Sequence, residues 1–169
     1  MTAEEFEGLA RQYGDTIFRV ACHALGNRPD AEDVSQTVLM KLYCAEQDFE
    51  SPEHIKHWLL RVTVNECRRV LRSPWRRRVL PLEDFDAPVQ GPETEGEVLA
   101  AVMALEPKYR TAVYLYYYED CTVREVAQVL GARESTVQTW LQRAREKLRR
   151  ALSESTKEGC GYVRPQNVP

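Results

Sequence analysis

Two helical patterns separated by a single glycine lie within residues 122–150, and they constrain the fold of this chain more than any other feature. Apolar residues recur at helical spacing on both sides of Gly131. Glycine adopts left-handed dihedrals without a steric penalty, so we expect Gly131 to end the first helix. Glu134 or Ser135 can cap the second helix. The pattern predicts a helix-turn-helix, whose second helix lies in the major groove of DNA.

The outer face of the second predicted helix carries polar side chains suited to DNA. Amides and hydroxyls near the start of such a helix can read base edges, while arginines bind phosphates or guanine. An ordinary helical hairpin with a solvated, charged face is the alternative interpretation of this segment taken alone. The outward-facing side chains are Gln138, Thr139, Gln142, Arg143 and Arg145.

The formal net charge of −3 conceals a strongly polarised chain. Residues 1–50 contain ten acidic and four basic residues. Residues 61–78 contain seven arginines and one glutamate, and residues 133–150 contain six basic and two acidic residues. Two separate basic patches suit a nucleic-acid partner, and an acidic N-terminal face suits a protein partner that carries basic residues.

Apolar periodicity predicts further helices ahead of this motif and no confident strand. The helical segments are residues 3–25, 30–48, 54–72, 93–105 and 107–118. Residues 74–92 contain four prolines and no sustained period, which is typical of a linker. The sequence therefore predicts an all-α fold of two small helical domains, residues 1–73 and 93–156, joined by a flexible linker. Residues 157–169 are predicted to be a disordered tail.

Several classes of function find no support in the sequence. No apolar run approaches the length needed to cross a bilayer, and the acidic N-terminus is unlike a secretion signal, so we expect a cytoplasmic protein without membrane insertion. The five cysteines are scattered singly, which indicates reduced structural thiols. No phosphate-cradling loop, metal-spaced ligand set or plausible catalytic triad is present, so neither an enzyme nor a bound metal or cofactor is expected.

Two longer stretches resemble a known family. RPDAEDVSQTVLMKLYCAEQDF, followed by HWLLRVTVNECRRVLR, resembles conserved region 2 of bacterial sigma factors. ALEPKYRTAVYLYYYEDC, which runs on into the helix-turn-helix, resembles their region 4. The long connection and the absence of regions 1 and 3 point to the extracytoplasmic-function (group 4) class. The resemblance covers roughly residues 5–155, and it implies a three-helix region 2 module and a helix-turn-helix region 4 module.

The resemblance implies two functional surfaces in region 2. The second helix would bind the clamp helices of the polymerase β′ subunit, and its acidic side chains would steer it toward basic clamp residues. The residues that match this surface are Asp30, Asp33, Gln36, Thr37 and Met40. The third helix would recognise and melt the −10 promoter element, with an unstacked base held in a protein pocket. The residues that match this surface are His54, Lys56, Arg61, Asn65, Arg68, Arg69 and Arg72. Asn65 is the candidate base reader, because an amide both donates and accepts hydrogen bonds.

The resemblance also implies that region 4 reads the −35 element as duplex DNA. The matching positions are Arg133, Gln138, Thr139, Gln142, Arg143 and Arg145. Trp140 departs from the family pattern, because an arginine or similar polar residue is usual there. Of the four tyrosines within residues 114–118, we expect some to lie in the core and others to contact the β flap of the polymerase.

The implied partners are core RNA polymerase, promoter DNA and an anti-sigma factor that inserts between the two domains. Two weak binding modules on one tether bind strongly when both engage the same promoter. The alternative is a stand-alone helix-turn-helix regulator that binds palindromic duplex DNA as a dimer. That alternative leaves the basic patch of the third helix without a role.

Overall fold

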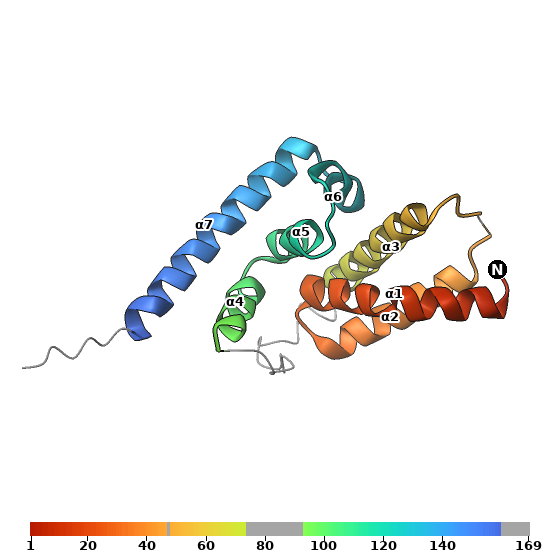
Figure 1. Cartoon of the computed structure of the whole chain (residues 1–169), viewed down its shortest axis with the longest axis horizontal. Helices are drawn as coiled ribbons and strands as arrows, with labels where there is room; N and C mark the ends of the chain where they lie inside the picture. The colour runs from red at the N-terminus through yellow and green to blue at the C-terminus, as the bar shows by residue number, and fades with distance from the viewer. Residues whose placement is uncertain (47, 74–92, 160–169) are drawn as a thin grey trace, which may run out of the picture.

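The computed structural model describes residues 1–46, 48–73 and 93–159, which fold into seven helices (Figure 1). The N-terminal module consists of α1 (Ala3–Leu25), α2 (Arg28–Tyr43) and α3 (Pro52–Arg72). The C-terminal module consists of α4 (Glu93–Met103), α5 (Pro107–Tyr117), α6 (Val123–Leu130) and α7 (Glu134–Gly159). These residues contain no strand, which confirms the predicted all-α class. The predicted linker at 74–92, and the tail from residue 160 onward, lie outside the described residues.

Local sequence signals fix several helix ends. Thr2 and Thr122 each form a capping box with the glutamate three residues later, at the starts of α1 and α6. Gly26 and Gly131 follow the ends of these helices with φ of 64° and 59°, in the left-handed region. The turn predicted at Gly131 is therefore confirmed.

Three predicted helix limits are wrong. The second helix was expected over residues 30–48 but starts at Arg28, because the Asn27 side chain caps it by accepting from the Asp30 amide. It ends at Tyr43, after the last fully buried apolar position of its period, Leu42. The third helix starts at Pro52, two residues early, with the Ser51 side chain as its cap.

The start and end of α7 also differ from expectation. Glu134 and Ser135 do not cap this helix, because they lie inside its first turn. The first helical hydrogen bond joins the Val137 amide to the Arg133 carbonyl at 3.1 Å. At the other end α7 continues to Gly159, past residue 157, where the tail was expected to begin.

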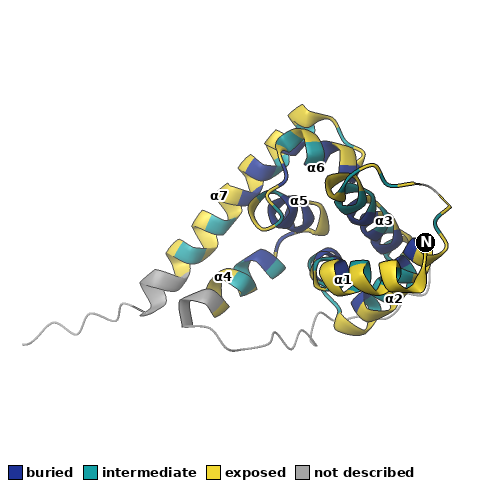
Figure 2. Ribbon diagram, turned by 45° about the vertical axis from the view of Figure 1, so that its right-hand side comes forward, coloured by how far each residue is buried: buried dark blue, intermediate teal, exposed yellow. Residues whose placement is uncertain are grey.

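The core of the N-terminal module lies between α1, α2 and α3 (Figure 2). Its fully buried side chains include Ile17, Val38, Leu42 and Leu59. The Tyr13 hydroxyl donates to the Pro52 carbonyl at 3.3 Å, which links α1 to the start of α3. This packing fixes the angle between α2 and α3, the helices that carry the two functional surfaces predicted for this module.

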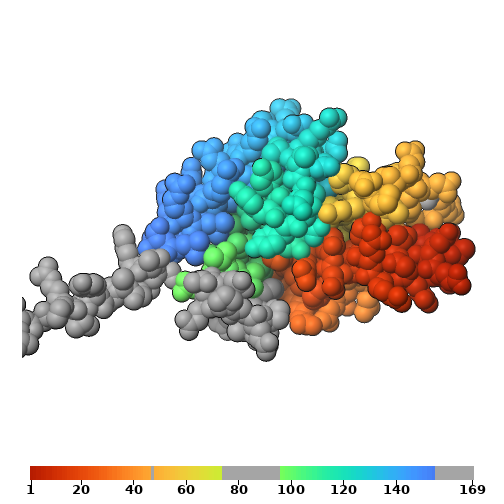
Figure 3. All heavy atoms as spheres, viewed as in Figure 1, coloured from red at the N-terminus to blue at the C-terminus, as the bar shows by residue number. Residues whose placement is uncertain are grey.

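The core of the C-terminal module extends into the N-terminal module. Val20 of α1, together with Leu60 and Val64 of α3, joins the apolar cluster built by α5, α6 and α7. All three are at most 3% exposed. In the space-filling view the atoms of α5 and α6 lie directly against those of α1 and α3 (Figure 3). The sequence predicted two modules on a tether, and it did not predict that they share a core.

The prediction of structural thiols is confirmed for Cys22, Cys67 and Cys121, which are buried, but not for Cys44, which is exposed. None of the four that the structure describes forms a disulfide. Burial raises the pKa of the Cys22 and Cys121 thiols to about 11, which keeps them protonated and unreactive at neutral pH. Among the described residues, no helix is both long and apolar enough to cross a membrane.

Candidate nucleic-acid interface

The helix-turn-helix is built from α6, the turn at Gly131 and the first half of α7. Val126, Val137 and Leu141 are at most 1% exposed, and their packing sets the angle between the two helices. The opposite face of α7 is left to solvent. All six residues predicted to contact the −35 element are exposed: Arg133, Gln138, Thr139, Gln142, Arg143 and Arg145.

Three of these six side chains make contacts along their own helix. The Thr139 hydroxyl donates to the Ser135 carbonyl at 3.0 Å. The Gln142 amide donates to the Glu146 carboxylate at 3.3 Å, and Arg145 Nε donates to the Leu141 carbonyl at 3.1 Å. Such local contacts hold the side chains against an exposed helix face, from which they can exchange to a nucleic acid.

Trp140 does not belong to this outer face. Its half-buried ring packs against the core of the C-terminal module. It also lines a cavity of about 200 Å³ together with Cys67 and Leu71 of α3. The tryptophan at this position, where the family usually has a polar residue, therefore contributes to core packing. The exposed polar face of α7 is not interrupted by it.

A second exposed stripe runs along α3. Successive members are seven, four, four and three residues apart, a spacing that keeps them on one side of a helix. The stripe consists of His54, Arg61, Asn65, Arg69 and Arg72, and all five are exposed. Arg69 Nε lies 3.0 Å from the buried Glu66 carboxylate, which also binds Lys41 of α2 at 2.5 Å. Glu66 thus positions one arginine of the stripe relative to α2.

Lys56 and Arg68 lie off this stripe and contact the C-terminal module. Lys56 Nζ donates to the Glu119 carbonyl at 2.9 Å and pairs with its carboxylate at 3.1 Å. Arg68 Nη2 donates to the Leu130 carbonyl at 2.6 Å, at the C-terminal end of α6. Burial lowers the pKa of the Arg68 guanidinium, which remains charged. Of the seven residues predicted to contact the −10 element, five are therefore exposed, and the other two bind the C-terminal module.

The remaining histidines also have intramolecular partners. His57 Nε2 lies 3.1 Å from the Glu125 carboxylate of α6. The His23 ring stacks on Tyr114 with 4.1 Å between ring centroids. Tyr114 is buried, whereas Tyr117 and Tyr118 are exposed. The prediction that some of these tyrosines lie in the core is therefore confirmed. Contact with the β flap stays a prediction.

The outer surface of α2 carries the residues expected to bind core polymerase. Asp33, Gln36 and Met40 are exposed, and Met40 is 69% exposed although it is apolar. Asp30 and Thr37 are half-buried at the edge of this surface. Sequence reasoning missed Tyr43, which is 55% exposed. Tyr43 lies three residues after Met40, and this spacing places both side chains on the same side of the helix. The spacing could have indicated that Tyr43 belongs to the surface.

Both modules match known protein families. The family description "Sigma-70 region 2" matches residues 9–77, and "Sigma-70, region 4" matches residues 95–148. The ECF RNA polymerase sigma factor SigM of Mycobacterium tuberculosis is 30% identical over 151 residues, which cover 87% of this chain and 76% of SigM. The chain belongs to the sigma-70 family, in its extracytoplasmic-function class.

Other sigma factors of this class are similarly related. SigE of Mycolicibacterium smegmatis is 30% identical over 164 residues, or 90% of this chain. The chain spans 63% of the length of that relative. Among solved structures, the sigma factor RpoE of Bartonella quintana, in complex with the anti-sigma factor NepR, gives a TM-score of 0.77 at 22% identity. The alignment covers 89% of this chain and 98% of RpoE, and it supports the fold.

These matches favour a promoter-directing sigma factor over a stand-alone helix-turn-helix regulator, because region 2 is present as well as region 4. The stripe on α3 lies in region 2, and the polar face of α7 lies in region 4. No group of three or more potential metal ligands occurs among the residues that the structure describes. The two exposed helix faces carry mainly arginines, amides and hydroxyls.

Proposed function

We propose that this sigma factor directs RNA polymerase to promoters by binding DNA at two places, with α7 on the −35 element and α3 on the −10 element. One observation carries the proposal: each of two modules presents an exposed, arginine-containing polar face on one helix. Neutralisation of phosphates by these arginines releases counterions, so promoter binding is expected to weaken as salt increases.

In region 4, α7 enters the major groove of the −35 duplex. Gln138, Thr139 and Gln142 carry the donors and acceptors that distinguish base edges. Arg143 makes the strongest single contact, a bidentate pair with guanine or with a phosphate. Arg133 and Arg145 bind the flanking backbone and fix the position of the helix.

In region 2, α3 binds the melted −10 element. Asn65 lies at the centre of the exposed stripe and reads a base through its amide. Arg61, Arg69 and Arg72 bind phosphates of the separated strand. His54 is at the N-terminal end of the same stripe, where it can stack on an unpaired base.

The partner at α2 is core RNA polymerase, through the clamp helices of its β′ subunit. Exposed apolar side chains beside acidic ones are typical of a surface that docks on a basic protein partner. Met40 and Tyr43 supply apolar contact area, and Asp33 supplies the charge. The activity is one of binding and not of catalysis, and the protein acts in the cytoplasm, where its polymerase is. An anti-sigma factor is a further partner, as it is for RpoE of Bartonella quintana.

Charge reversal on α2 tests the polymerase contact. We expect Asp33→Lys to weaken association with core polymerase roughly 10-fold, because a favourable charge contact becomes a repulsive one. Asp15→Lys is the control, because Asp15 is also an exposed aspartate but lies on α1, outside the proposed surface. Affinity is measured by titrating fluorescently labelled protein with core polymerase at two salt concentrations. Equal affinities of the two variants would show that this surface of α2 does not contact the polymerase.

A further inference from the structure

A buried arginine of region 4 binds the end of a region 2 helix. Arg110 of α5 is 4% exposed. Its Nε donates to the carbonyl of His23, its Nη2 donates to the carbonyl of Ala24 at 3.2 Å, and its Nη1 donates to that of Met103 at 2.8 Å. His23 and Ala24 lie in the last turn of α1, where carbonyls have no helical partner and the helix dipole is negative. Arg110 therefore caps a helix of the other module.

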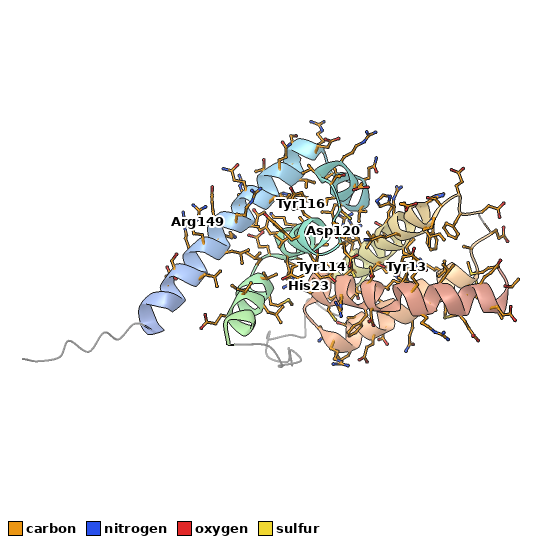
Figure 4. All side chains as sticks on the ribbon, viewed as in Figure 1. Tyr13, His23, Tyr114, Tyr116, Asp120 and Arg149 are labelled. Atoms are coloured by element: carbon orange, nitrogen blue, oxygen red, sulfur yellow. The ribbon has the colours of Figure 1, made fainter. Side chains whose placement is uncertain are left out.

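The surroundings of Arg110 fit this contact closely. A Cβ on Gly26 would lie 3.3 Å from Arg110 Nη2, so the residue after α1 leaves room for the guanidinium. His23 and Tyr114 meet where the end of α1 approaches α5 (Figure 4). Burial lowers the pKa of His23, which keeps its ring neutral beside the charged guanidinium. A buried arginine is costly unless its donors are satisfied, and here Nε, Nη1 and Nη2 each donate to a carbonyl oxygen.

A second group of contacts joins the modules on the α3 side. Lys56 pairs with Glu119, His57 with Glu125, and Arg68 with the Leu130 carbonyl. Between the two groups of contacts lies the shared apolar core that contains Leu60 and Val64. We call this packing of region 4 on region 2 the closed arrangement.

The closed arrangement is incompatible with binding both promoter elements at once. In the closed arrangement α6 of the helix-turn-helix packs directly on α3, a helix of 21 residues that is about 32 Å long. Elements about 25 base pairs apart are separated by about 85 Å along straight duplex DNA. Lys56 and Arg68, both expected at the −10 element, are also occupied by region 4.

We propose that this sigma factor inhibits itself: its own region 4 holds region 2 in the closed arrangement through Arg110, and the chain must open before it can bind a promoter. No second protein is needed for this inhibition. The proposal rests on the proposed function, since only a promoter-binding chain has an activity to inhibit. The closed population reduces the apparent affinity for polymerase and promoter by the fraction of molecules that are open.

Small-angle X-ray scattering of the full chain tests the closed arrangement without polymerase. Arg110→Ala removes the cap on α1, and Glu119→Lys places two lysines at the contact with Lys56. We expect either variant to increase the radius of gyration by roughly 5 Å or more, because separated modules form a longer particle. Arg149→Ala and Glu97→Lys change exposed residues of the same module and should leave the radius unchanged.

Circular dichroism identifies any variant that has lost its helices. If Arg110→Ala has lost helix, Glu119→Lys decides the test, because Glu119 lies in the turn between α5 and α6 and not within a helix. Expansion of a folded variant supports the proposal. A wild type that is already extended, or folded variants that both keep the wild-type radius, would overturn it.

Transcription with limiting core polymerase separates this proposal from the proposed function. The opened variants should reach half-maximal transcription at a several-fold lower concentration than the wild type. If the variants expand in scattering but no form of the chain directs transcription, the closed arrangement stands and the proposed function fails. If transcription is normal and the variants are no better than the wild type, the inhibition fails and the proposed function stands.

Discussion

Arg143→Ala should lower transcription from a promoter that depends on its −35 element by roughly 10-fold or more. A good bidentate arginine contact contributes about 1–3 kcal/mol, and about 1.4 kcal/mol corresponds to a tenfold change. Arg143 is exposed on the first half of α7, so its replacement leaves the buried residues of the helix-turn-helix in place. The effect should therefore appear in promoter binding and not in the free energy of unfolding.

Arg149→Ala is the matched control for this experiment. It removes the same charge from the same helix, at an exposed position six residues further on (Figure 4). Run-off transcription with both variants, on templates with and without the −35 element, separates a loss of sequence reading from a loss of general charge. Equal decreases for the two variants would mean that Arg143 contributes only net charge.

Leu60→Ala should lower the free energy of unfolding by about 2–5 kcal/mol, the usual cost of removing a buried leucine. Leu60 is 1% exposed, but it belongs to the core that region 4 completes. Its neighbour Leu59 is also 1% exposed and lies in the core of region 2 alone. Leu59→Ala is thus a control of the same residue type, on the same helix, with the same burial.

Comparison of these two leucines shows whether the shared core persists in solution. We expect similar losses for both variants in urea unfolding followed by circular dichroism. If region 4 were detached, Leu60 would face solvent, and surface substitutions usually change stability by no more than about 0.5 kcal/mol. A large loss for Leu59→Ala together with a negligible one for Leu60→Ala would contradict the shared core.

The parts of the fold that were predictable from the sequence depend on local signals. Gly131 ends α6 because a left-handed residue is needed there, and the apolar spacing around it positions α6 and α7. The exposed faces of α3 and α7 follow from the same helical period. The start of α2 was misplaced because Asn27 takes the cap two residues earlier than the apolar pattern suggests.

The contacts between modules could not be predicted in this way, because they join residues that are distant in sequence. Arg110 and His23 are 87 residues apart, and an arginine within an apolar helix gives no indication of which carbonyls it will bind. Arg68 was assigned to the −10 surface with its neighbour Arg69, but the two side chains lie about 100° apart around the helix. One faces α6 and the other faces solvent.

Run-off transcription with purified core polymerase and the unmodified chain tests the central claim most directly. Templates carry an intact promoter, or the same promoter without its −35 or without its −10 element. We expect a promoter-specific transcript only when the chain is added, and its loss when either element is removed, because binding at two places supplies the affinity. If the chain leaves core polymerase without promoter specificity, or binds palindromic duplex tightly as a dimer without polymerase, the account is contradicted.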